Sequence, residues 1–169
     1  GYVAPKHYDA IKETGGELIA ILDPHDNVGI LDSYFPKCQY FREFERFDRF
    51  CSGQDIDYTV VCSPNFYHFD HCVWALNQGM DVICEKPTVL TVDELNKLIV
   101  VEQETGHHVW SILQLRLSNV LTKLEVQESD SGWIDVKYHT PRGPWYSTSW
   151  KGSVAKSGGL ATAIGVHLF

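Results

Sequence analysis

The chain has 169 residues, of which 44% are hydrophobic and 21% charged, and its formal net charge is −8. At about 150 residues per domain, this length gives roughly one domain, or one domain and a piece of another. The acidic balance argues against nucleic-acid binding, because phosphate recognition needs clustered Lys and Arg. No apolar run approaches the roughly 20 residues of a membrane-spanning helix, and no signal peptide is recognisable, so we expect no membrane partner either.

The five cysteines are scattered along the chain without a CxxC pair or any other metal-type spacing. We therefore expect reduced thiols in a cytoplasmic protein. His68 and His71 form an HxxH pair, but no third ligand accompanies them. The sequence accordingly predicts no metal site.

The first stretch predicts a helix and then a buried strand. The helix is expected over residues 3–14, with Pro5 in its first turn, where a missing N–H costs nothing, and with Gly15 and Gly16 at its end. The apolar run over residues 17–23 has the length and continuous hydrophobicity of a strand covered on both faces. This strand is expected to end in an aspartate.

Gly1 and Asp23 have the spacing of a dinucleotide-binding motif. About 20 residues separate such a glycine turn from the acid that binds the adenosine ribose, and Gly1-x-x-Ala4 matches the second half of G-x-G-x-x-G/A. We therefore assign cofactor binding to Gly1, Tyr2, Val3 and Asp23. The alternative is an ordinary helix N-terminus and an aspartate in a turn. A carboxylate here repels a 2′-phosphate, so NAD is preferred over NADP.

Four phenylalanines recur at every third residue in the less regular segment that follows. Phe41, Phe44, Phe47 and Phe50 predict one short helix with an aromatic stripe. We interpret this stripe as a face packed on the core, and a stacking platform for bases is the alternative.

Strands and helices then alternate at short intervals. The expected strands cover residues 57–62, 80–84 and 108–113, and the expected helices cover residues 66–78 and 91–105. Thr91 and Glu94 have the spacing of a capping box at the start of the last helix. This alternation predicts right-handed crossovers and an α/β fold, a Rossmann-like doubly wound parallel sheet whose first strand is missing, over residues 1–115.

The character of the sequence changes after residue 115. A helix is expected over residues 118–127, a strand with one wet face over residues 133–140, and a loop over residues 141–146. We interpret residues 116–169 as the beginning of a second, α+β domain. Both ends of the sequence predict that it is a piece of a longer protein.

Lys86 follows an apolar strand directly, within Glu85-Lys86-Pro87. Open α/β sheets bind ligands at the carboxyl ends of their strands, so Lys86 is a candidate site residue. Pro87 restricts the backbone of Lys86 to extended angles and so helps to aim its side chain. The alternative is that Lys86 is an ordinary lysine in a solvated loop. His167, near the end of the sequence, is a second candidate, and its alternative is an ordinary histidine within a helix.

Three motifs in this order resemble the Gfo/Idh/MocA family of NAD(P)-dependent sugar oxidoreductases. They are Ser63-Pro64-Asn65-x-x-His68, Glu85-Lys86-Pro87 and Gly165-Val166-His167. Four stretches, at residues 81–87, 112–116, 142–152 and 164–167, are together similar to the UDP-N-acetylglucosaminuronate 3-dehydrogenase branch of that family. The resemblance implies a Rossmann domain followed by a substrate domain, through whose sheet the protein forms a homo-oligomer.

The resemblance also implies an activity. Such an enzyme oxidises the C3 hydroxyl of a nucleotide sugar to a ketone, passes the hydride to NAD, and regenerates the cofactor with 2-oxoglutarate, in the synthesis of bacterial surface polysaccharides. Another sugar or polyol dehydrogenase of the family and a non-catalytic NAD-binding sensor are the alternatives. Ala163 departs from the resemblance, because many members of the family have Asp four residues before the histidine and the similar branch has Asn.

The resemblance assigns residues to roles. Alcohol oxidation needs a base and a donor to the developing oxyanion, and we assign these roles to His167 and Lys86, with the exchanged roles as the alternative. The implied cofactor contacts are Ser63, Pro64, Asn65, His68, Glu85, Lys86 and Trp150. The implied substrate contacts are Lys86, Gln114, Arg116, Arg142, Tyr146, Lys151 and His167.

Overall fold

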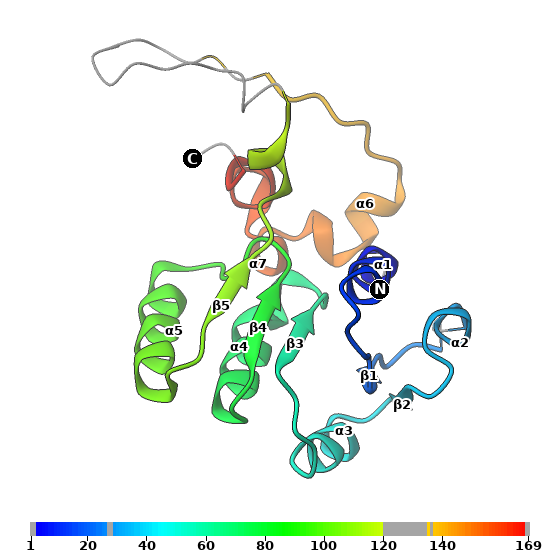
Figure 1. Ribbon diagram of the computed structural model, residues 1–169. Helices are drawn as coiled ribbons and strands as arrows, with labels where there is room; N and C mark the ends of the chain where they lie inside the picture. Colours follow the sequence, from blue (N-terminus) through cyan, green and yellow to red (C-terminus); the bar gives the residue numbers. More distant parts are fainter. Residues whose placement is uncertain (1–2, 27–28, 120–134, 136, 168–169) are drawn as a thin grey trace.

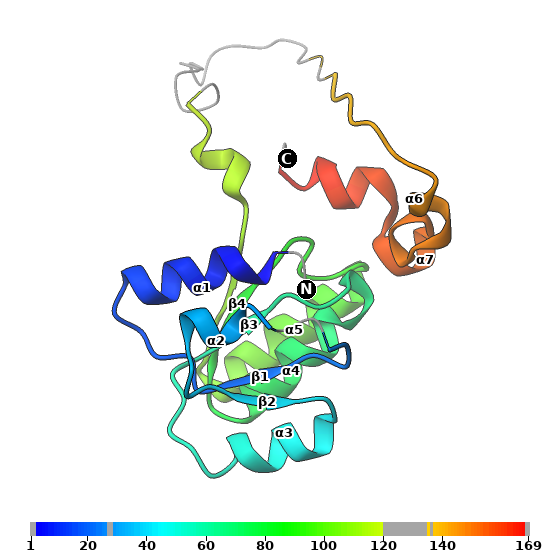
Figure 2. The same ribbon diagram turned by 90° about the vertical axis from the view of Figure 1, so that its right-hand side faces the viewer.

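The computed structural model describes residues 3–26, 29–119, 135 and 137–167, and its helices and strands alternate along the chain (Figures 1 and 2). The elements are α1 Ala4–Glu13, β1 Ala20–Leu22, α2 Leu31–Tyr34, β2 Gln39–Phe41, α3 Phe44–Cys51, β3 Tyr58–Val61, α4 His68–Asn77, β4 Asp81–Cys84, α5 Val92–Thr105, β5 Val109–Ser111, α6 Trp145–Thr148 and α7 Val154–Ser157. Short 3-10 turns cover Asn65–Tyr67, Gln114–Leu117 and Trp150–Gly152, and a π-helical turn covers Ala161–Gly165.

All described strands are parallel to their neighbours, which confirms the predicted α/β class. β1 pairs with β2, and β3, β4 and β5 form a second group with β4 in the middle. In this register Val61 lies opposite Cys84, and Cys84 lies opposite Ser111. The carboxyl ends of β3, β4 and β5 therefore meet at one edge, and Figure 1 shows the C-terminal segment, in orange and red, at that edge.

The core lies between β3, β4 and the helices α4 and α5. α4 packs against both strands and against α5. Its buried residues contact the inward-facing positions of the two strands and Leu98 of α5. The buried set is Val61, Cys72, Ala75, Leu76, Met80, Val82, Cys84 and Leu98. Burial of these apolar side chains stabilises the sheet on this face at about 25 cal/mol per Å² removed from water.

The segment before β3 differs from the sequence prediction. The first strand is shorter than residues 17–23, and the prediction missed both α2 and β2. Phe41 lies on β2 instead of on the aromatic helix, because the chain is extended at Glu43 before α3 begins. The ring of Phe41 still packs on Phe47 and Phe50 of that helix, at centroid distances of 6.0 and 5.2 Å, so the stripe is a packed face as expected.

α5 has the predicted start and end. The Thr91 hydroxyl accepts a hydrogen bond from the Glu94 N–H at 3.1 Å, and the Glu94 carboxylate accepts one from the Thr91 N–H at 3.2 Å, which completes the capping box. At the other end Gly106 has φ +75°, a left-handed conformation that favours glycine.

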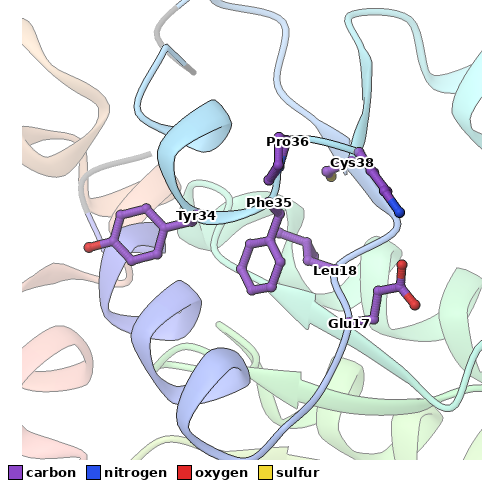
Figure 3. Close-up of a pocket in the computed structure, with 7 residues that line it drawn as sticks. Glu17, Leu18, Tyr34, Phe35, Pro36 and Cys38 are labelled. Carbon is purple, nitrogen blue, oxygen red and sulfur yellow. The ribbon is translucent and has the colours of Figure 1, made fainter.

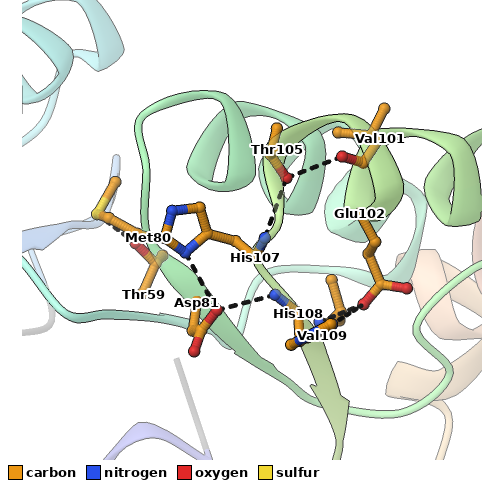
Figure 4. Close-up of polar contacts among 9 residues, drawn as sticks. All are labelled: Thr59, Met80, Asp81, Val101, Glu102, Thr105, His107, His108 and Val109. Atoms are coloured by element: carbon orange, nitrogen blue, oxygen red, sulfur yellow. Dashed lines mark hydrogen bonds and ion pairs between the residues drawn. The ribbon is translucent and has the colours of Figure 1, made fainter.

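Two carboxylates join α5 and β4 to the start of β5 (Figure 4). Glu102 accepts a hydrogen bond from the Val109 N–H at 2.6 Å. Asp81 accepts one from the His108 N–H at 2.8 Å and lies 3.3 Å from Nδ1 of His107. These bonds lower the pKa of Asp81, the bond from the His108 backbone most of all. They fix the amino end of β5, opposite the edge where the strands end.

The C-terminal part differs from prediction in the residues that the structure describes. Residues 135 and 137–140 form no strand, because no described strand lies beside them to complete a hydrogen-bond ladder. The helix expected over residues 118–127 lies outside the described residues from residue 120 on, and residues 118–119 are not helical. Part of the expected loop is the short helix α6. The boundary near residue 115 stays a prediction.

The cysteines of the chain are free thiols, as predicted. No helix in the described ranges is both long enough and apolar enough to cross a bilayer.

We predict that Thr91→Ala lowers the free energy of unfolding by about 1 kcal/mol, because it removes an N-cap acceptor from α5. Urea unfolding followed by circular dichroism measures this difference. Glu104→Ala, at an exposed position of the same helix, is the control and should change stability by less than about 0.5 kcal/mol. Equal effects of the two substitutions would show that the capping box does not stabilise α5.

Candidate functional site

The carboxyl edge of β3, β4 and β5 brings together charged groups from distant parts of the sequence. The loop that begins at Ser63 follows β3, and Glu85 and Lys86 follow β4. The amino end of α1 lies beside these loops (Figures 1 and 2), and the turn Ala161–Gly165 approaches from the C-terminal side.

Lys86 is joined to the C-terminal segment by its side chain. Its Nζ donates a hydrogen bond to the carbonyl oxygen of Ala163 at 2.8 Å. Burial lowers the pKa of Lys86, and the positive charges of Lys151 and Arg142 lower it further, while Glu85 opposes them. The ammonium keeps two further N–H groups.

His167 is buried close to Lys86. Its side chain is 5% exposed, and its Nδ1 has no hydrogen-bond partner within the described part of the chain. Burial lowers the pKa of His167, and the charge of Lys86 lowers it further, so the ring is neutral at pH 7. The structure thus brings the two predicted catalytic candidates together, with an unused nitrogen on one and unused donors on the other.

Glu85 is paired with His7, a residue that the sequence did not single out. His7 Nε2 lies 3.0 Å from Oε1 of Glu85, and both side chains are largely buried. Hydrogen bonds to Cys62 and to Glu85 raise the pKa of His7 to about 9. The same pairing lowers the pKa of Glu85. No local pattern predicts a contact between residues 78 positions apart.

The loop after β3 is held at three points. Asn65, 7% exposed, donates from Nδ2 to the carbonyl oxygen of Ser157 at 2.9 Å. The ring nitrogens of His68 lie 2.8 Å from the Ser63 carbonyl oxygen and 2.7 Å from that of Pro87. The Ser63 hydroxyl lies 2.9 Å from Nδ1 of His71. His68 therefore faces the protein with both nitrogens, although the resemblance implied a cofactor contact for it.

These contacts close into a ring of hydrogen bonds. Lys86 binds Ala163, in the helical turn that follows α7, and Asn65 binds Ser157, the last residue of α7. His68 connects the two loops that carry Asn65 and Lys86. The ring joins the ends of β3 and β4 to the segment that carries His167.

Aromatic and cationic side chains lie next to one another in the segment around α6. The Arg142 guanidinium lies 4.8 Å from the ring centre of Tyr146. Lys151 Nζ lies 5.7 Å from the ring centres of both Trp145 and Trp150. Because Lys151 and Arg142 both lower the pKa of Lys86, this cluster adds positive charge to the carboxyl edge.

The remaining candidates lie in several places. Val3 caps α1, while Gly1 and Tyr2 lie outside the described residues. Asp23 directly follows β1, and one of its carboxylate oxygens accepts the His25 N–H at 2.9 Å. Pro64 precedes the 3-10 turn that begins at Asn65. Gln114 and Arg116 are exposed on the turn Gln114–Leu117.

A cavity of about 230 Å³ lies elsewhere (Figure 3). It is lined by Glu17, Leu18, Tyr34, Phe35, Pro36, Lys37 and Cys38. These residues precede β1 and β2, so the cavity is at the amino ends of parallel strands, where open α/β sheets do not bind their ligands. Among the residues described, no cluster of His, Cys, Asp or Glu side chains has the arrangement of a metal site.

Parallel strands that alternate with helices and end in charged groups define a dinucleotide-binding α/β domain of the Rossmann type. Residues 1–112 match the family model of the Gfo/Idh/MocA oxidoreductases, described as an oxidoreductase family with an NAD-binding Rossmann fold. The chain belongs to this family.

Solved structures are similar over almost the whole chain. The WlbA (WbpB) dehydrogenase from Thermus thermophilus, in complex with NAD and UDP-GlcNAcA, is 44% identical with a TM-score of 0.91, over 99% of this chain and 57% of that protein. Its complex with NAD and alpha-ketoglutarate aligns at 41% identity with a TM-score of 0.88, over the same shares of the two chains. The chain thus spans little more than half of this relative.

Curated relatives are more distant. The 2,7-anhydro-N-acetylneuraminate hydratase of Mediterraneibacter gnavus is 26% identical over 95 residues, which are 56% of this chain and 24% of the hydratase. The 1,5-anhydro-D-fructose reductase of Ensifer adhaerens is 25% identical over 97 residues, 57% of this chain and 28% of the reductase. These relatives differ from one another in the reaction for which they are named.

We predict that protonated His7, hydrogen-bonded to Cys62 and Glu85, makes the free energy of unfolding fall at alkaline pH. Folded His7 keeps its proton up to about pH 9, whereas His7 of the unfolded chain loses it above about pH 6.5. The contribution of His7 to the free energy of unfolding, about 3 kcal/mol, is therefore fully present below pH 6.5 and is lost as the pH rises towards 9. His7→Gln should flatten this decline, measured by urea unfolding at pH 6, 8 and 9.5.

His139→Gln, at an exposed position, is the control for this series and should follow the wild type at each pH. A His7→Gln profile parallel to the wild type would rule out His7 as the cause of the decline.

Proposed function

We propose that the chain is part of an NAD-dependent dehydrogenase that oxidises the C3 hydroxyl of UDP-N-acetylglucosaminuronic acid to the 3-keto nucleotide sugar. The observation that carries this proposal is the juxtaposition of Lys86 and His167 at the carboxyl edge of the sheet. The substrate is supported by the 44% identity to the Thermus thermophilus dehydrogenase, whose structure contains NAD and UDP-GlcNAcA.

The two side chains suit the two tasks of alcohol oxidation. NAD, when bound, would supply the acceptor for the hydride that leaves the carbinol carbon. His167 is neutral and has an unpartnered Nδ1, so it takes the hydroxyl proton as general base. Lys86 donates one N–H to Ala163 and directs a second towards the reacting oxygen, which stabilises its developing negative charge.

The charge of the site suits an anionic sugar nucleotide. Arg142 and Lys151 lie close enough to Lys86 to lower its pKa. A carboxylate or diphosphate placed between these cations forms charge-assisted hydrogen bonds. Tyr146 completes the proposed substrate contacts of this cluster, Trp150 contacts the cofactor, and Gln114 and Arg116 contact the substrate from the turn after β5.

The cofactor-binding proposal places NAD along the loops after β1, β3 and β4. Asp23 binds the ribose hydroxyls and disfavours the 2′-phosphate of NADP. Ser63, Pro64, Asn65 and Glu85 line the cofactor path at the strand ends. Gly1, Tyr2 and Val3 are the proposed contacts of the cofactor diphosphate, which a helix N-terminus such as that of α1 suits.

Ala163 bears on the choice of substrate. Its methyl group cannot hold a sugar hydroxyl or orient His167 as an Asp or Asn side chain would. Its carbonyl oxygen, however, holds Lys86 at 2.8 Å. We infer that the chemistry of the Lys86–His167 pair is retained and that discrimination among sugars is altered, so another sugar or polyol of the same family is the alternative substrate.

The wider context is part of the same proposal. 2-Oxoglutarate regenerates NAD, which the alpha-ketoglutarate complex of the Thermus protein supports. The whole protein forms a homo-oligomer through the sheet of its second domain, over residues 116–169 and beyond. It acts in the cytoplasm in surface-polysaccharide synthesis. A non-catalytic NAD-binding sensor is the rival function, favoured by the absence of an Asp or Asn side chain at Ala163.

An assay of the whole protein separates these possibilities. We expect NADH and a 3-keto product from NAD and UDP-N-acetylglucosaminuronic acid, and steady turnover when 2-oxoglutarate is added. Lys86→Met should lower kcat by at least about 10²-fold, because it removes the oxyanion donor. Bound NAD without any product would support the sensor, and turnover of a different sugar would reassign the substrate.

The pH dependence tests the role of His167. Oxidation should decline in acid as His167 becomes protonated, with a midpoint below the ordinary histidine value of about 6.5, because burial and Lys86 lower its pKa. Lys86→Met removes a nearby positive charge, so the midpoint of its residual activity should move to higher pH. Glu85→Gln removes the opposing charge and should move it lower. Identical midpoints in all three proteins would exclude His167 as the titrating base.

A further inference from the structure

His68 occupies an unusual position for a histidine of a ligand site. Its ring is 1% exposed at the start of α4, between the loops that follow β3 and β4. Nδ1 lies 2.7 Å from the Pro87 carbonyl oxygen and Nε2 lies 2.8 Å from the Ser63 carbonyl oxygen. Carbonyl oxygens only accept hydrogen bonds, so both bonds form only when both ring nitrogens carry hydrogen. The ring is then an imidazolium with both donors used by the protein.

His71, one turn further along α4, acts on the same loop differently. Its Nδ1 lies 2.9 Å from the Ser63 hydroxyl. Burial lowers the pKa of His71, and His68 lowers it further, so His71 stays neutral. A neutral ring nitrogen accepts from a hydroxyl. The two histidines therefore hold Ser63 at two atoms, but only His68 also reaches the loop after β4.

The second loop is the one that carries Lys86, because Pro87 is the next residue. Lys86 also binds Ala163 at 2.8 Å, and Asn65, on the first loop, binds Ser157 at 2.9 Å. Both loops thus contact the segment that leads to His167. His68 connects the two loops that make these contacts.

We propose that His68 is a positioning residue: as an imidazolium that donates to the carbonyl oxygens of Ser63 and Pro87, it fixes the loops after β3 and β4 and so holds Lys86 opposite His167. It does this without contact to cofactor or substrate, because its ring is buried and both nitrogens are used. The hydrogen bonding stands on the structure alone, and only the effect on turnover rests on the proposed dehydrogenase function.

Nuclear magnetic resonance of the ¹⁵N-histidine-labelled protein tests the hydrogen bonding without any substrate. From the two carbonyl acceptors we expect two ring N–H signals from His68, both protected from exchange with water because the ring is buried. The signals are assigned by their loss in His68→Asn. A single N–H signal from His68, with one unprotonated nitrogen, would overturn the proposal, whatever the protein catalyses.

Turnover tests the positioning. His68→Asn should lower kcat by about 10²-fold with little change in KM for the sugar or NAD, because a displacement of about 1 Å at a reacting group has an effect of this size. His68→Gln, like His68→Asn, keeps an amide that can donate to only one of the two carbonyl oxygens, so its kcat should also fall below that of the wild type. His71→Asn keeps the bond to Pro87 and should retain kcat to within about threefold, a barrier change well under 1.36 kcal/mol.

The outcomes are distinguishable. Equal losses of kcat in His68→Asn and His71→Asn, or losses confined to KM, would overturn the positioning role. Unfolding curves of each variant show whether it is folded, and if His68→Asn does not fold, His68→Gln gives the same comparison. A wild type without turnover on any sugar would contradict the proposed function, and the two N–H signals would still decide whether His68 joins the loops.

Discussion

The hydrogen bond from Lys86 Nζ to the Ala163 carbonyl oxygen is the interaction on which the arrangement of the site depends. It joins the end of a central strand to the helical turn before His167. Because Lys86 is partly buried and surrounded by other cations, its ammonium needs an acceptor, and the C-terminal segment supplies one. The contact thereby places a neutral imidazole, whose Nδ1 has no partner among the described residues, within the electrostatic influence of a lysine.

The sheet makes this contact possible. Parallel pairing of β3, β4 and β5 brings three strand ends to one edge, where the backbone leaves the ladder and side chains become available. His7 then pairs with Glu85, which leaves the neighbouring Lys86 without a carboxylate bonded to it among the described ion pairs. A lysine that is not neutralised in this way remains able to bind an anionic ligand or a developing oxyanion.

The sequence predicted the features that local patterns encode. Apolar runs and glycine stops gave the alternating strands and helices from residue 57 on, and the Thr91–Glu94 spacing gave the capping box. It missed β2 and α2, because elements of three or four residues carry too little periodicity to be recognised. Phe41 was wrongly predicted to lie on the helix because it stands three residues before Phe44, a spacing typical of one helix face. It lies on β2 instead, and only its ring packs on α3.

The candidate site was less predictable, because its contacts join residues that are distant in sequence and use backbone atoms. Motif resemblance singled out Lys86 and His167, but the partner of Lys86 is a main-chain carbonyl, whose presence is independent of the side chain at position 163. The same holds for His68, whose two acceptors are carbonyl oxygens. A substitution that removes a side chain from such a site leaves these backbone contacts intact. The chain can therefore hold Lys86 beside His167 with an alanine at position 163.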